Sequence, residues 1–140
     1  MKRNLIGILS MVVMSVVMNA AAQAQTVAKA NVPFAFKVGS AQLPAGTYEI
    51  RTISENVVAI KSSNGGAGAL SLARRDSTKN ASSKLVFHHL AGQYFLTEIW
   101  GAPGTAGKMI PRSKQETNLE KELRAAGQPS ASEEILIALN

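Results

Sequence analysis

The chain has 140 residues, no cysteine and a formal net charge of +6. The lack of cysteine excludes disulfides, thiol nucleophiles and thiolate metal sites. The basic residues are spread along the sequence, with no run longer than Arg74-Arg75, and this excludes the clustered stripe typical of nucleic-acid binding. The length suits one domain rather than two.

The first 24 residues have the three parts of a secretory signal. They are a positive start at Lys2-Arg3, an apolar stretch from Leu5 to Met18 and a small-residue segment that ends in Ala22-Gln23-Ala24. This pattern predicts cleavage between Ala24 and Gln25, with a cut two residues earlier as the alternative. A membrane-spanning helix needs about 20 apolar residues, and the apolar stretch is shorter. We therefore expect an exported protein, periplasmic or secreted, without a stable membrane anchor.

The rest of the chain is rich in short segments typical of strands. Residues 25–31 are predicted to be a flexible leader, and residues 32–140 a single β-rich domain. Alternating apolar and polar residues, β-branched residues and flanking turns indicate the strands. They are expected at residues 32–38, 47–53, 57–60, 69–73, 84–90, 93–100 and 134–139. All seven aromatic residues lie in these segments, which favours strands. Residues 74–83 and 101–107 are expected to be loops.

One helix is predicted at about residues 114–126. Ser113 and Glu116 form a capping box at its start, and Gly127 ends it. Leu119 and Leu123 make a narrow apolar stripe that is expected to dock on the sheet. The fold class is therefore all-β, mainly antiparallel: a small β-sandwich or barrel with one C-terminal helix.

The clearest hairpin joins residues 84–90 to residues 93–100 through Ala91-Gly92. A two-residue turn there sets His88 opposite Phe95 and His89 opposite Tyr94. Neighbouring strand residues point to opposite faces of a sheet, so the two histidines do not chelate one metal. Packing between aromatic and imidazole rings accounts for both histidines, and no metal site is predicted.

Sequence signals for catalysis or cofactors are weak. Residues 102–109 resemble a phosphate-binding loop, but Met109 stands where that motif needs a hydroxyl, and no helix follows at once. The chain also lacks the Gly-x-Ser-x-Gly elbow of serine hydrolases. We therefore predict no nucleotide, no cofactor and no catalytic residue.

Three side chains are candidates for partner binding: Trp100, Tyr94 and His88. Trp100 ends a predicted strand beside a Gly-rich loop, and an exposed tryptophan there would anchor a glycan or a protein. The interpretation that we favour for Trp100 is that its ring closes the core or its rim.

Three segments together resemble a group of short exported bacterial proteins of uncharacterised function. The first is VPFAFKVGSAQLPAGTYEIR at Val32–Arg51, the second is LVFHHLAGQYFLTEIW at Leu85–Trp100, and the third is the PRSKQE helix start at Pro111–Glu116. The resemblance implies a compact β domain in the cell envelope. It brings no activity and no functional residues.

The expected function is that of an exported, non-catalytic envelope module that binds a protein or polysaccharide partner. The alternative is a small periplasmic hydrolase with a dispersed Ser/His/carboxylate site, which requires a pocket with His88 or His89 beside an acid and a hydroxyl. A third possibility is a structural component whose sheet edge pairs with other chains.

Overall fold

The computed structural model describes residues 27–79, 82–129 and 133–140. The predicted signal, with its cleavage site at Ala24 and Gln25, lies outside the described residues. Within the described part of the chain, no helix has the length and apolar character needed to cross a membrane.

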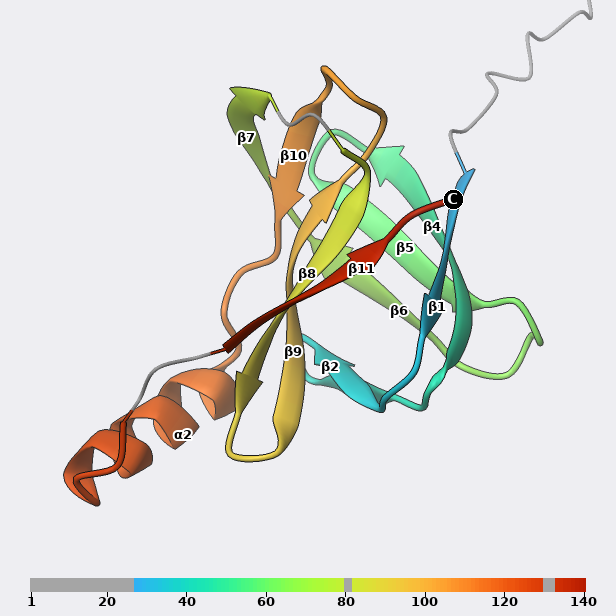
Figure 1. Ribbon diagram of the computed structural model, residues 1–140. Coiled ribbons are helices and arrows are strands. Elements are labelled where there is room, and N and C mark those ends of the chain that lie inside the picture. Colours follow the sequence, from blue (N-terminus) through green and yellow to red (C-terminus); the bar gives the residue numbers. More distant parts are fainter. Residues whose placement is uncertain (1–26, 80–81, 130–132) are drawn as a thin grey trace, which may run out of the picture.

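The strands form two sheets that pack face to face in a sandwich-like arrangement (Figure 1). The first sheet has the order β1 (Val27–Val32), β4 (Gly46–Ser54), β5 (Val57–Ser62) and β6 (Gly68–Leu72), and every pair in it is antiparallel. The second has the order β11 (Glu133–Ala138), β8 (Lys84–Leu90), β9 (Gln93–Trp100), β10 (Ala106–Met109) and β7 (Arg74–Lys79). A short hairpin of β2 (Phe36–Val38) and β3 (Ala41–Leu43) lies beside β9. With the helix α2 (Lys114–Ala125), this confirms the predicted all-β, mainly antiparallel class with one C-terminal helix.

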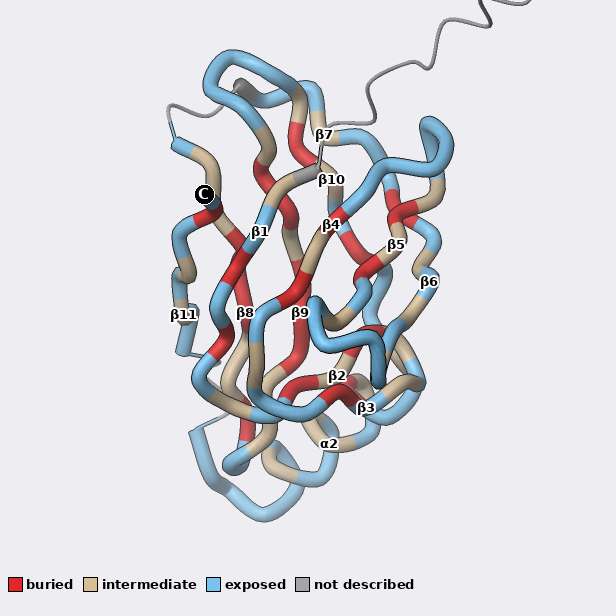
Figure 2. Tube along the Cα trace, turned by 90° about the vertical axis from the view of Figure 1, so that its right-hand side faces the viewer, coloured by how far each residue is buried: buried red, intermediate tan, exposed pale blue. Residues whose placement is uncertain are grey.

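The core lies between the two sheets, and buried residues alternate with less buried ones in the first half of β4 and along β5 (Figure 2). Tyr48 and Ile50 of β4 are buried, as their spacing predicts. The rings of Tyr48 and Phe87 each meet Phe36 edge-on, with centroids 5.1 and 5.3 Å away. Edge-to-face packing of this kind adds stability beyond the area buried, and here it ties the β2–β3 hairpin to both sheets.

The two sheets are joined along both sides of the sandwich. On one side, the N–H of Lys29 in β1 donates to the carbonyl of Asn140 at 3.0 Å, and the N–H of Asn140 donates back at 2.9 Å. On the other side, the chain passes from β6 through Ala73 straight into β7 of the second sheet. The β6 strand ends the order of its sheet, and among the described strands none pairs with its outer edge.

The start of the domain differs from the prediction. Residues 27–31 are not a flexible leader, because they belong to β1 and pair with β4 from Val27–Arg51 to Val32–Gly46. The single strand expected at residues 32–38 is broken around Pro33, so that β1 ends and β2 begins at Phe36. Proline has no N–H for a ladder, and Phe34 lies in the link between the two strands.

Two strands occur where loops were expected. Residues 74–79 form β7 and residues 106–109 form β10, and the two strands pair with each other. The segment that resembles a phosphate-binding loop therefore ends in a strand. The strand β7 is polar and β10 reads Ala-Gly-Lys-Met, so neither has an alternating apolar pattern. Their pairing across the fold therefore determines their structure.

The helix α2 begins as predicted, and its most buried residue is Glu116 rather than a leucine of the expected stripe. The N–H of Glu116 donates to Oγ of the N-cap residue Ser113 at 3.1 Å. Leu119 and Leu123 are only half-buried, and the buried residue of the helix is Glu116 in the first turn. Figure 1 shows α2 projecting from one end of the sandwich, so the helix is attached to the sheet mainly by its start.

Candidate binding groove

The β8–β9 hairpin has the predicted register. His88 faces Phe95 and His89 faces Tyr94. Ala91 and Gly92 both have positive φ, at 47° and 75°, which is the conformation of the two-residue turns that match strand twist. The turn therefore fixes the positions of both histidines.

His88 lies between two carboxylates rather than between aromatic rings. Its Nδ1 is 3.4 Å from Oε1 of Glu116 in α2, and its Nε2 is 3.9 Å from Oε1 of Glu134 in β11. Both His88 and Glu116 are largely buried, with side chains 15% and 4% exposed. Sequence reasoning missed these acids because they are 28 and 46 residues away along the chain.

His89 and Tyr94 belong to a stack of three rings. The Tyr94 ring lies 4.4 Å from His89 at an interplanar angle of 12° and 3.9 Å from Phe34 at 16°. Because a ring has two faces, this stack covers both faces of Tyr94. Tyr94 is therefore not an open platform for a sugar or a planar ligand.

Trp100 is buried, contrary to the idea of an exposed anchor. The residue is 6% exposed, and its Nε1 donates to Oε2 of Glu98 at 2.7 Å. Its ring lies against the backbone of Gly107 in β10. Trp100, Tyr94 and His88 therefore do not form one exposed surface. In the described part of the chain, no group of three His, Asp or Glu residues is arranged to hold a metal ion.

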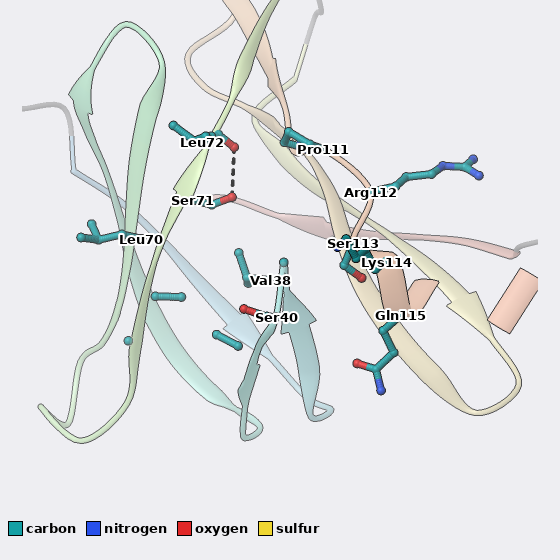
Figure 3. Close-up of a pocket in the computed structure, with 14 residues that line it drawn as sticks. Val38, Ser40, Leu70, Ser71, Leu72, Pro111, Arg112, Ser113, Lys114 and Gln115 are labelled. Atoms are coloured by element: carbon teal, nitrogen blue, oxygen red, sulfur yellow. Dashed lines mark hydrogen bonds between the residues drawn. The ribbon is translucent and has the colours of Figure 1, made fainter. Parts of the chain in front are cut away.

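A groove with a volume of about 780 Å³ lies elsewhere, beside the outer edge of β6. Figure 3 shows β6 on one side and the Pro111–Gln115 segment, which leads into α2, on the other, with Val38 and Ser40 between them. A second hollow of about 520 Å³ lies at the β5–β6 hairpin and shares Gly68, Ala69 and Leu70 with the groove. The β6 strand thus has open space beside it, and β3 also lies close to it.

Two exposed leucines mark the same strand. Leu70 is 75% exposed and Leu72 is 69% exposed, and residues two apart in a strand lie on the same face. In Figure 3 the side chain of Leu70 points away from the Pro111–Gln115 wall, toward the outer face of the first sheet. Large exposed apolar side chains next to one another are typical of interaction sites.

The pairing of β5 with β6 shows which backbone groups face the groove. The N–H of Ser62 donates to the carbonyl of Ala67, and the N–H of Ala73 donates to the carbonyl of Asn56. Hydrogen-bonded pairs alternate along an antiparallel ladder. The N–H and carbonyl groups of Gly68, Leu70 and Leu72 therefore point away from β5, toward the outer edge. The sequence predicted a strand here but gave no signal that its edge is uncovered.

In comparisons with known proteins, no family model, no curated protein and no solved structure matches this chain. The resemblance to short exported bacterial proteins therefore stays a prediction, and the function is argued from the groove.

Proposed function

We propose that this chain is an exported, non-catalytic module that binds a partner protein of the cell envelope at the β6 groove. The observation that carries the proposal is the pair of exposed leucines, Leu70 and Leu72, on a strand whose outer edge has no partner among the described strands. An apolar strand edge of this kind is a template for pairing with another chain. Export rests on the signal-like pattern of residues 1–24.

The groove favours a protein over a polysaccharide. Sugar rings bind through polar groups and through stacking on aromatic side chains, and none of the described residues that line the groove is aromatic. The groove offers instead two leucines and a row of backbone hydrogen-bonding groups, which suit a polypeptide. The pair formed by His88 and Glu116 does not line the groove, so it lends no support to hydrolysis there.

Site-directed photocross-linking in the bacterium that encodes the chain tests the proposal. A benzoylphenylalanine photoprobe is placed at position 70 or 72, and at position 53 as a matched control. Ile53 is also exposed, at 52%, but lies on β4, which β5 separates from β6. We expect the probes at positions 70 and 72 to give one discrete adduct of the same size, and the probe at position 53 to give none. Because the expected partner is a protein, protease should degrade the cross-linked partner.

Two outcomes would overturn the proposal. One is an adduct whose partner is resistant to protease but is degraded by glycan-degrading enzymes, which would identify a polysaccharide partner. The other is the absence of an adduct at both β6 positions in protein recovered from the envelope. The intact mass of the same recovered protein tests export, because cleavage predicts a chain that begins at Gln25 or Gln23.

A further inference from the structure

We infer that the partner contributes an extended, acidic segment that joins the first sheet as a fifth strand along β6. This inference rests on the proposed function and specifies how the groove is used. Strand addition is an established way for sheets to bind peptides, in which main-chain hydrogen bonds give affinity and alternate side chains give specificity.

The backbone of β6 provides the hydrogen-bonding pattern for an added strand. Gly68, Leu70 and Leu72 direct their N–H and carbonyl groups to the outer edge. The carbonyl of Leu72 also accepts a hydrogen bond from the Ser71 hydroxyl at 3.0 Å (Figure 3). A carbonyl has two lone pairs, so this bond leaves room for an N–H from a partner.

The side chains around β6 also alternate as strand addition requires. Alternate residues of an added strand would point into the groove, toward Val38 and Ala69. The intervening residues would lie beside Leu70 and Leu72 on the outer face. Side chains of neighbouring strands on one face stabilise a sheet by packing together, so the partner side chains that lie beside Leu70 and Leu72 are expected to be apolar.

The charge of the groove wall favours a carboxylate. Arg112 and Lys114 are its charged residues, and none of the described lining residues is acidic. The guanidinium of Arg112 points away from β6 (Figure 3). It pairs with Glu120 of α2 at 2.8 Å. Lys114 is thus the cation that we expect to meet an acidic side chain of the partner.

The β6 edge also differs from the other sheet edges. Natural edge strands are protected by charged residues or by a covering segment. Asn140 binds across the edge of β1, β7 carries Arg74 and Arg75, and β11 begins with Glu133 and Glu134. In contrast, β6 reads Gly-Ala-Leu-Ser-Leu and has no charged residue. An edge strand without charged residues, beside a groove wall that carries Lys114, fits a site for strand pairing.

The test uses synthetic peptides in which leucine alternates with glutamate, added to the isotope-labelled exported protein and followed by amide chemical shifts. We expect shifts in β6, in residues 38–41 and in residues 111–115. Two further peptides are N-methylated at every second residue. One phase carries the methyl groups on the odd-numbered residues, and the other phase carries them on the even-numbered residues. Only one phase removes the N–H groups that bond to β6, so we expect it to weaken binding at least about tenfold. The other phase should change affinity little.

The charge is tested with Lys114→Glu. This variant should weaken the leucine–glutamate peptide several-fold and strengthen a leucine–lysine peptide. Lys121→Glu is the matched control, since Lys121 is an exposed lysine of α2 outside the groove. Equal effects of both variants would mean that net charge, not the groove, drives binding, and would overturn the acidic assignment.

The outcomes separate this inference from the proposed function. If the two N-methylated peptides bind equally well, or if no peptide shifts β6, strand addition is wrong. The photocross-linked adduct at positions 70 and 72 would then still support a protein partner bound in another way. Loss of that adduct would overturn the proposed function and the inference together.

Discussion

At the scale of single residues, the contact between Trp100 and Gly107 explains why the candidate anchor is buried. The sequence places a tryptophan at the end of β9 beside a Gly-rich segment, a position that favours the core but is also compatible with the surface. The pairing of β10 with β9 and β7 brings Gly107 under the indole ring, and the missing side chain makes room for it. The residue that decides the burial of Trp100 is thus a glycine seven positions away.

Gly107→Ala should therefore destabilise the protein. A Cβ at position 107 would lie 2.5 Å from Cζ3 of Trp100, and the buried ring has little freedom to move. Overpacking of this kind costs about 1–3 kcal/mol. Urea unfolding followed by tryptophan fluorescence measures the change. Gly66→Ala is the control, since a Cβ there meets open space. Equal midpoints for the two variants would contradict the account of Trp100.

At the scale of elements, the sequence predicts structure well where the pattern is local. The bounds of β8 and β9 are predicted to the residue, and the two-residue turn sets the register beside it. The register shift between Val86 and Phe87, farther from the turn, was not predicted. The strands β7 and β10 are missed, because polar residues such as those of Arg74–Lys79 become strands only by pairing across the fold. The groove escapes prediction for the same reason: β6, the β2–β3 hairpin and residues 111–115 meet only in the folded chain.

The helix α2 shows how one contact can hold an element. Its leucine stripe is only half-buried, whereas Glu116 is buried against His88. A helix of this length is marginal by itself, so its order depends on the contact at its first turn.

Glu116→Ala should release the helix. The variant removes the carboxylate that faces the buried His88, and an unsatisfied buried polar group costs about 1–3 kcal/mol. We expect the amides of α2 to exchange faster with deuterium, while those of β8 and β9 keep their protection. Glu122→Ala changes an exposed acid of the same helix and should leave exchange unaltered. Unchanged protection of α2 in Glu116→Ala would show that other contacts hold it.

At the scale of the whole molecule, a seam between β1 and Asn140 joins the sheets on the side away from β6. Two backbone hydrogen bonds cross it, and the neighbouring Leu139 is buried in the core at 9% exposure. Apolar periodicity predicted the closing strand at residues 134–139. It did not predict that β1 lies beside the end of this segment, because residues 27–31 carry no strong pattern. The closure of the fold is thus a long-range property that local sequence does not encode.

Leu139→Ala should weaken the seam. Truncating a buried leucine costs about 2–5 kcal/mol, and part of the loss should appear as faster amide exchange in β1. Leu136→Ala is the matched control, because Leu136 precedes it by three residues and is 55% exposed. We expect the control to stay within about 0.5 kcal/mol of the parent in urea unfolding. If the two variants lose equal stability, the seam does not depend on Leu139.

The seam also determines how the domain can be attached to a support. Lys29 and Asn140 are hydrogen-bonded neighbours. A tag, a fusion or an immobilising linker is therefore attached at the same corner of the domain, whether it is joined before β1 or after Asn140. Strands β1 and β6 are opposite edges of the first sheet (Figure 2). A domain coupled to a sensor chip or a bead through either end would therefore present the groove to the solution, with its entrance unobstructed.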